Sequence, residues 1–311
     1  MSKLKSLLKR TPGVNPAYQS LKRFYCAARS VTSPFLRPVP AGHFYSPLAD
    51  MREVRAQQRV LFDRSATECP GVHVRAEHQL GVLDEMARFY DEVPFADTAV
   101  NGCRYYYQNT FFSPGDAIVL YATLRRLRPK RVVEVGSGFS SAVMLDTNDR
   151  FLQREINFTF IDPYPNRLLR LLSDEDRRRH KIITTSVQQV PPEEFAALAA
   201  GDILFIDSSH VVKIGSDVRH LFWEVLPRLP AGVIIHFHDV FWPFEYPEQW
   251  VLTGTGWNEA YFVRTFLQFN SAFQIEYFNS YVATVHEQAL RARMPQCLPR
   301  SGGSLWLKKI A

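Results

Sequence analysis

The sequence has few cysteines and no long apolar run. Its four cysteines are far apart and form no CxxC pair: they are Cys26, Cys69, Cys103 and Cys297. Neither a zinc site nor a disulfide framework is therefore indicated. No apolar run approaches the ~20 residues that a membrane-spanning helix needs. Reduced cysteines and the lack of a spanning segment predict a cytoplasmic protein.

A strong excess of one charge is also lacking. The formal net charge is +6 over 311 residues, and the basic residues are scattered. No nucleic-acid partner is therefore expected. The start, MSKLKSLLKR, could form a short basic amphipathic helix that touches a membrane surface. A solvated, frayed terminus is the simpler interpretation.

The chain divides into two regions by pattern. Hydrophobic residues make up 46% and charged residues 22%, which is ordinary globular composition. Residues 1–111 lack a strand–helix rhythm and are interpreted as an N-terminal extension, extended and partly helical. Apolar residues at helical spacing predict helices over residues 50–62 and 77–92. Residues 112–311 are expected to form the functional domain.

From residue 112 the pattern becomes regular. Ser113, Pro114 and Asp116 predict the start of a helix that runs to Leu127. Short β-branched runs then alternate with helical stretches. The runs cover residues 131–135, 158–161, 181–184, 203–206 and 233–237, with two late candidates at 273–278 and 304–309.

These runs lack polar alternation, as parallel strands covered on both faces do. The sequence therefore predicts a doubly wound, Rossmann-like α/β fold. Its seven-stranded sheet should be mostly parallel, with the two late strands forming an antiparallel edge.

The first strand of the series leads into a glycine turn, VVEVGSGFSSAV. Gly136 and Gly138 permit tight backbone geometry and close approach of a ligand. Position 141 is Ser, where a dinucleotide-binding fingerprint needs a third glycine. A carboxylate at Glu134 would repel a pyrophosphate and attract a cation. The turn thus favours a cationic nucleoside over NAD.

The E-x-G-x-G turn of Glu134, Gly136 and Gly138 resembles the first motif of class I S-adenosylmethionine-dependent methyltransferases. Asp162, which ends the second strand in FTFIDPYP, supports the resemblance because an acid there can accept both ribose hydroxyls. The resemblance covers about residues 112–311. It is nearest to the small-molecule O-methyltransferase-like subgroup, with D-x-x-H after the fourth strand and H-D after the fifth.

The resemblance implies that S-adenosylmethionine is the cofactor. The residues it assigns to cofactor binding are Glu134, Gly136, Ser137, Gly138, Asp162, Ser186, Val187 and Asp207. Ser186 and Val187 are assigned only by their position after the third strand.

Four chemically active side chains follow the fourth and fifth strands: Asp207, His210, His238 and Asp239. Two roles are open. Asp207 and Asp239 could hold Mg²⁺, which prefers carboxylate oxygens, although Val240 stands where catechol-type relatives have an Asn. Alternatively, His210 or His238, with a reference pKa of ~6.5, could take a proton from a substrate hydroxyl as a metal-free base.

Two neighbouring features have simpler interpretations. His236 shares a strand face with His238 but lies deeper, so we expect a hydrogen-bonded core histidine. The aromatic segment FWPFEYPEQW, residues 241–250, is expected to form a lid over the substrate entrance.

The functional hypothesis is a cytoplasmic S-adenosylmethionine-dependent methyltransferase that methylates an oxygen of a small molecule or a sugar. Three alternatives remain open at this point. One is an NAD-dependent oxidoreductase, and another is a non-catalytic module that binds a nucleoside or a protein. The third is a hydroxylase-like relative with the same fold. The sequence does not indicate an oligomeric state.

Overall fold

The structure is a computed structural model that describes residues 20–21, 24–25, 27–28 and 39–311. Two compact units are formed by residues 1–57 and 58–311. In the first unit, helix α3 (Met51–Ala56) begins at Asp50, whose side chain accepts a hydrogen bond from the Arg52 N–H. The basic start of the sequence lies outside the described residues. Within the described ranges, no helix combines the length and apolar character needed to cross a membrane.

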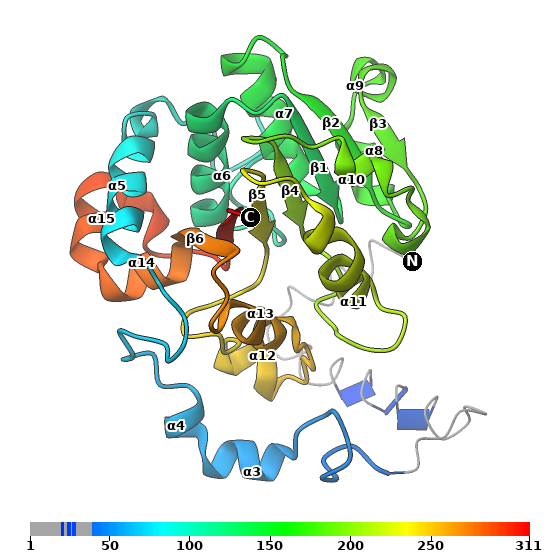
Figure 1. Cartoon of the computed structure of the whole chain (residues 1–311), viewed down its shortest axis with the longest axis vertical. Coiled ribbons are helices and arrows are strands. Elements are labelled where there is room, and N and C mark those ends of the chain that lie inside the picture. Colours follow the sequence, from blue (N-terminus) through cyan, green and yellow to red (C-terminus); the bar gives the residue numbers. More distant parts are fainter. Residues whose placement is uncertain (1–19, 22–23, 26, 29–38) are drawn as a thin grey trace. The chain divides into compact units, whose positions relative to one another are not determined.

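The larger unit is built on a seven-stranded sheet in the order β3-β2-β1-β4-β5-β7-β6 (Figure 1). The strands are β1 (Arg131–Val135), β2 (Asn157–Ile161), β3 (Lys181–Ile183), β4 (Ile203–Ile206), β5 (Ile234–Phe237), β6 (Phe273–Phe278) and β7 (Leu305–Lys309). Strands β1 to β5 are parallel to one another, and β7 runs antiparallel to both β5 and β6. The predicted doubly wound fold with an antiparallel edge is confirmed.

Helices and short helical turns connect these strands. The α-helices are α4 (Gln58–Leu61), α5 (Ala76–Ala87), α6 (Pro114–Leu127), α7 (Phe139–Phe151), α8 (Asn166–Leu171), α9 (Asp174–Arg179), α10 (Glu193–Ala196), α11 (Asp217–His220), α12 (Glu248–Leu252), α13 (Glu259–Leu267), α14 (Asn279–Val285) and α15 (Glu287–Arg293). The short turns are η1 (Tyr90–Glu92), η2 (Val187–Gln189), η3 (Leu221–Val225), η4 (Leu226–Arg228) and η5 (Pro295–Cys297).

The two faces of the sheet are covered by different helices. Alternation along β5 sends His236 to one face and Phe237 to the other. His236 stacks on Phe205 of β4, with 3.7 Å between ring centroids. Helices α6 and α7 cover this face: His236 is hydrogen-bonded through Ser304 to Asp116 of α6, and serines of α7 bond to Glu134, which is in register with Phe205. On the other face, Phe237 lies 5.3 Å from Phe222 of η3, and Phe222 lies 4.9 Å from Phe262 of α13. Cover on both faces explains why the strands are apolar throughout.

Residues 58–111 belong to the same compact unit as the sheet. Helix α5 packs against β6 and α6, and Figure 1 shows it beside α14 and α15. The Gln79 side chain on α5 accepts a hydrogen bond from the Phe278 N–H at 2.8 Å. The compact units divide between residues 57 and 58, and the domain boundary predicted at residue 111 stays a prediction.

One arginine binds the segment before α6 to two later helices. The guanidinium of Arg104 contacts Asp146 and Asp149 of α7 at 2.8 and 2.9 Å, and Asp176 of α9 at 2.9 Å. The N–H groups of Arg104 and Tyr105 donate to the second oxygen of Asp146 at 2.8 and 2.9 Å. Because buried carboxylates need a paired charge, this arginine fixes the path of residues 104–112.

Candidate active site

Because β1, β2, β4 and β5 are parallel, their carboxyl ends lie side by side along one edge of the sheet, the edge formed by strand ends. Asp162 follows β2, Asp207 follows β4, and His238 and Asp239 follow β5. Strands β1 and β4 are adjacent without being consecutive, so the chain changes direction between them. Open α/β sheets bind ligands at such a switch point. The predicted acids and histidines are thus brought together there.

The glycine turn joins three strand ends. Gly136 has φ +85°, and a Cβ added to it would lie 1.7 Å from the carbonyl oxygen of Asp207. The Gly136 N–H donates to the Ile161 carbonyl at 2.9 Å, and the Asp207 N–H donates to the Val135 carbonyl at 2.8 Å. Only glycine fits at this position, because both the backbone conformation and the space exclude a side chain.

The Glu134 carboxyl group is enclosed by the first turn of α7. Its side chain is fully buried, with one oxygen accepting the Ser140 hydroxyl at 2.5 Å and the other accepting the Ser141 hydroxyl. Burial raises the pKa of Glu134 to about 8, although the two serine hydrogen bonds act in the opposite direction. Glu134 lies inside β1 and not after it, so its carboxyl group turns toward the first turn of α7. In this structure the Glu134 carboxyl group makes buried contacts within the protein, and its contact with a cofactor stays a prediction.

A cavity of about 560 Å³ lies at the ends of β1 and β2, and Ser137 and Asp162 line it. One oxygen of Asp162 accepts the Ser137 N–H at 3.2 Å, and the other accepts the Tyr164 N–H at 2.7 Å. These bonds orient the carboxylate and leave lone pairs free for further donors. The volume suits a small-molecule ligand, and an oriented acid in this position suits the hydroxyls of a ribose.

The other predicted cofactor residues do not line this cavity. Ser186 precedes η2, and Val187 within it is buried with 3% of its surface exposed. Asp207 contacts a histidine cluster at the neighbouring strand end. Contacts of these three residues with a cofactor stay predictions.

The cluster is centred on His210. Its Nδ1 atom lies 2.9 Å from Oε2 of Glu259, and its Nε2 atom lies 3.3 Å from Asp207 and 3.7 Å from Asp239. The indole of Trp257 packs against the imidazole with 4.3 Å between ring centroids. A buried imidazole is thus surrounded by three carboxyl groups from three different segments.

This surrounding determines the charge of His210. Burial lowers the pKa of His210, but the hydrogen bonds to Asp207 and Glu259 outweigh burial and hold it well above its ordinary value. Burial raises the pKa of Asp207, but His238 and His210 outweigh it and hold that pKa below its ordinary value. The carboxyl groups around His210 therefore favour its protonated form.

Local contacts fix His210 to the start of α13. The His210 residue has φ +58°, and its carbonyl oxygen accepts the N–H groups of Asn258 and Glu259 at 3.1 and 3.2 Å. The Asn258 side chain accepts the Val212 N–H at 2.6 Å. Sequence reasoning missed Glu259 as part of the site, because an acid in the first turn of a helix is common for purely local reasons.

His238 and His236 differ in their partners. His238 is 4% exposed, and its Nε2 atom lies 3.6 Å from Asp239. Within the described part of the chain, its Nδ1 atom has no hydrogen-bond partner. Burial lowers the pKa of His238, but Asp239, Asp207 and Asp116 together raise it. His236 is fully buried and hydrogen-bonded to Ser304 at 3.0 Å, so the expected core histidine is confirmed.

The cluster opens to solvent through its acids. The exposed fraction of the side chain is 31% for Asp207 and 17% for Asp239, against 7% for His210 and 2% for Glu259. His210 Nε2 approaches both acids. No group of three or more His, Cys, Asp or Glu side chains in the described ranges has an arrangement that could hold a metal ion. Asp207 and Asp239 as the two Mg²⁺ ligands stay a prediction.

Three aromatic residues of the segment after β5 belong to the core and do not form the expected lid. Trp242, Phe244 and Tyr246 are each at most 2% exposed. The Trp242 indole N–H donates to the Ala66 carbonyl at 2.7 Å. Aromatic residues of a lid and of a core look alike in sequence, and here the contacts with earlier segments place them in the core.

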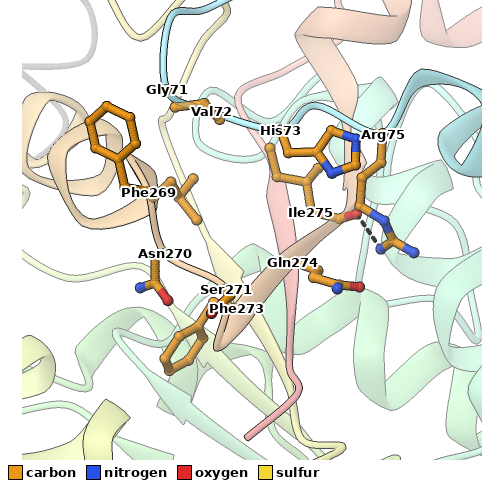
Figure 2. A pocket seen from close by; sticks show the side chains of 11 residues that line it. Gly71, Val72, His73, Arg75, Phe269, Asn270, Ser271, Phe273, Gln274 and Ile275 are labelled. Carbon is orange, nitrogen blue, oxygen red and sulfur yellow. Dashed lines mark hydrogen bonds between the residues drawn. The ribbon is translucent and has the colours of Figure 1, made fainter.

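A second cavity, of about 270 Å³, lies at the antiparallel edge of the sheet (Figure 2). Its arginine is already engaged, because Arg75 donates to the Ile275 carbonyl at 2.9 Å and contacts Glu276 at 3.3 Å. No sequence-predicted site residue lines this cavity. The cavity at the ends of β1 and β2 is therefore the candidate ligand site.

Comparison with known proteins gives two matches in sequence. Residues 133–240 match a family model described as a methyltransferase domain. A curated relative from Archaeoglobus fulgidus, described as an uncharacterized protein, is 37% identical over 134 residues, which are 42% of this chain and 61% of that relative. The chain thus spans less than two thirds of the length of that relative.

Two solved structures are remotely similar. The methyltransferase PaMTH1 of Podospora anserina, bound to SAH, shares 14% identity over 74% of this chain and 88% of its own, with a TM-score of 0.42. The O-methyltransferase TomG of Streptomyces achromogenes, in complex with SAM, shares 14% identity over 74% of this chain and 90% of its own, with a TM-score of 0.40. Likeness at this level adds no argument to the site.

Proposed function

We propose, on the premise that residues 133–240 are a methyltransferase domain, that this chain uses S-adenosylmethionine to methylate a hydroxyl oxygen of a small molecule or a sugar. The family match confirms the resemblance predicted from the glycine turn and Asp162, and it gives no support to the NAD-dependent alternative. The acceptor, the site roles and a cytoplasmic location are parts of the proposal.

The observation that carries the proposal is that two unlike regions adjoin at one edge of the sheet. The cavity with Asp162 lies at the ends of β1 and β2, and the imidazole–carboxylate cluster lies at the ends of β4 and β5. Gly136 joins them, because its backbone touches that of Asp207. A methyl donor in the cavity and an acceptor at the cluster are then neighbours.

The cofactor would supply an already activated methyl group. Ser137 and Asp162 are the residues that would hold its ribose. The chain must also align the acceptor and exclude water, and such positioning can supply up to ~7–11 kcal/mol. Asp207 and Asp239, the exposed members of the cluster, would orient the acceptor hydroxyl.

His210 is the proposed base. Glu259 holds its Nδ1 atom, which leaves Nε2 directed toward Asp207 and Asp239. Nε2 accepts the hydroxyl proton only in the neutral imidazole. Since the pKa of His210 is raised, that form becomes abundant only as the pH rises above neutrality, and methyl transfer should accelerate in that range.

Calorimetric titration with S-adenosylmethionine, S-adenosylhomocysteine and NAD⁺ tests the cofactor. We expect both sulfur nucleosides to bind and NAD⁺ not to bind. Binding of NAD⁺ alone would overturn the proposal.

Incubation with S-adenosylmethionine labelled in its methyl group tests the acceptor class. A panel of phenols, catechols and glycosides should include at least one compound that gains label on oxygen. Label found only on nitrogen or carbon acceptors would contradict the assignment to O-methylation, while the binding result would still stand.

A further inference from the structure

The side chain of Arg167 packs against Gly138, the last residue before α7. Arg167, in the first turn of α8, has its guanidinium carbon 3.7 Å from the centre of the Phe111 ring. Phe111 in turn stacks on Phe139, with 6.0 Å between ring centroids and 9° between planes. A Cβ added to Gly138 would lie 2.9 Å from Cδ and 3.4 Å from Nη1 of Arg167. The guanidinium therefore occupies the space that the missing side chain of Gly138 leaves.

The donors of Arg167 are not used within the protein. Across the described ranges, neither an ion pair nor a hydrogen bond joins its guanidinium to another residue, and its contact is the face of Phe111. Its neighbour Arg170 differs, because the Arg170 Nε–H donates to the Asn166 carbonyl at 3.1 Å. Both arginines line the cavity at the ends of β1 and β2.

A second unused donor lines the same cavity. Ser137 is 5% exposed, and its hydroxyl has no hydrogen-bond partner among the described residues. A buried hydroxyl without a partner costs free energy unless a ligand supplies one. Ser137 also lies just before the N-terminus of α7, a 13-residue helix whose dipole favours an anion there.

The acids nearby make no ion pair with Arg167 in the described ranges. Glu134 is enclosed by Ser140 and Ser141. Asp162 lines the same cavity, and its two oxygens accept backbone N–H groups. Arg167 is one of the charges that lower the pKa of Asp207, but the ion pair of Asp207 is with His210. A guanidinium and a serine hydroxyl thus keep donors free for a ligand beside a helix N-terminus, and a guanidinium fork matches a carboxylate.

We propose that Arg167, together with the Ser137 hydroxyl, binds the α-carboxylate of the amino-acid part of the methyl donor. The inference rests on the proposed function and names a recognition residue for it. It adds an anion-binding arginine to the residues expected at the turn.

Two ligands that differ only in the amino-acid part test the inference. S-adenosylhomocysteine carries the carboxylate, and 5′-methylthioadenosine keeps the nucleoside and the thioether without it. Calorimetry on Arg167→Gln should show S-adenosylhomocysteine bound about tenfold or more weakly, with the affinity for 5′-methylthioadenosine within about twofold of the unmodified chain. Arg167→Lys should fall between, because an ammonium keeps the charge and loses the fork.

Arg178→Gln is the control, since Arg178 is an exposed arginine on the next helix, α9, and does not line the cavity. It should leave both affinities within about twofold. Equal weakening of both ligands by Arg167→Gln, no weakening of either, or a selective loss as large in Arg178→Gln would each overturn the inference. If the unmodified chain binds neither nucleoside, the proposed function fails instead, so the two failures are distinguishable.

Discussion

Glu134 and Asp207 are carboxylates on adjacent strands with opposite environments. Glu134 is the fourth residue of the five-residue strand β1, is fully buried, and is bonded by two serines of the following helix. Asp207 is the first residue after β4, and 31% of its side chain is exposed. An acid one residue inside a strand supports the fold, whereas an acid one residue beyond it can meet a ligand.

The largest expected effect tests how tightly the two strand ends are joined. Gly136→Ala should lower the free energy of unfolding by about 4 kcal/mol or more, because the added Cβ would meet the Asp207 carbonyl oxygen. Gly201→Ala is the matched control: Gly201 has φ +88° and nothing within 4 Å of an added Cβ, so it should cost only about 1–2 kcal/mol. Urea unfolding measures both, and equal losses would refute the close approach.

The burial of Glu134 predicts that the free energy of unfolding depends on pH. The pKa of Glu134 is raised in the folded state to about 8, so the native chain holds a proton that the unfolded chain releases near pH 4.5. That contribution is complete below the unfolded pKa and is lost as the pH rises toward 8. Between pH 5 and pH 8 the chain should lose a few kcal/mol of stability more than Glu134→Gln does. Urea unfolding at several pH values measures this difference. If the unmodified chain and Glu134→Gln lose stability in parallel as the pH rises, Glu134 is charged in the folded protein.

The contact of Asp207 with His210 predicts a catalytic effect. His210→Asn should reduce label transfer to the best acceptor by about 100-fold or more, with the affinity for S-adenosylhomocysteine within about twofold. His220→Asn, on α11, is the control and should keep the unmodified rate. A loss of cofactor affinity equal to the loss of rate would mean that His210 maintains the cavity and does not accept a proton.

The smallest expected effect is a shift in the pH dependence of methyl transfer when Glu259 is changed. Glu259→Gln removes one of three carboxyl groups around His210, so the pKa of His210 should fall. The midpoint of the pH–rate profile should then move to lower pH by about one unit. Glu287→Gln, at the start of α15, should leave the midpoint unchanged. An unmoved midpoint in Glu259→Gln would assign the proton transfer to another group.

The fold was largely predictable because its signals are local. The runs 131–135, 203–206 and 273–278 are apolar, rich in β-branched or aromatic residues and flanked by turns, and their predicted bounds match β1, β4 and β6. Ser113 and Pro114 start α6 as capping rules require. The helices between β6 and β7 were not predicted, because their residues show no marked periodicity.

The site was predictable only where a residue follows a strand. Asp162, Asp207 and His238 belong to that class, and all lie at the sheet edge. Arg167 and Glu259 come from helices, and only the folded chain brings them to the site. The enclosure of the Glu134 carboxyl group by Ser140 and Ser141 was not predicted. Two serines in the first turn of a helix give no sign in the sequence of which side chain they contact.

The contact made by Arg104 sets a lower limit on how far the chain can be shortened. A fragment of residues 112–311 would keep all strands of the seven-stranded sheet and lose Arg104, leaving the buried Asp146 and Asp176 without their shared cation. It would also lose Phe111, against which Arg167 rests. The part of the molecule that handles ligands is thus completed by a segment that precedes all of its strands.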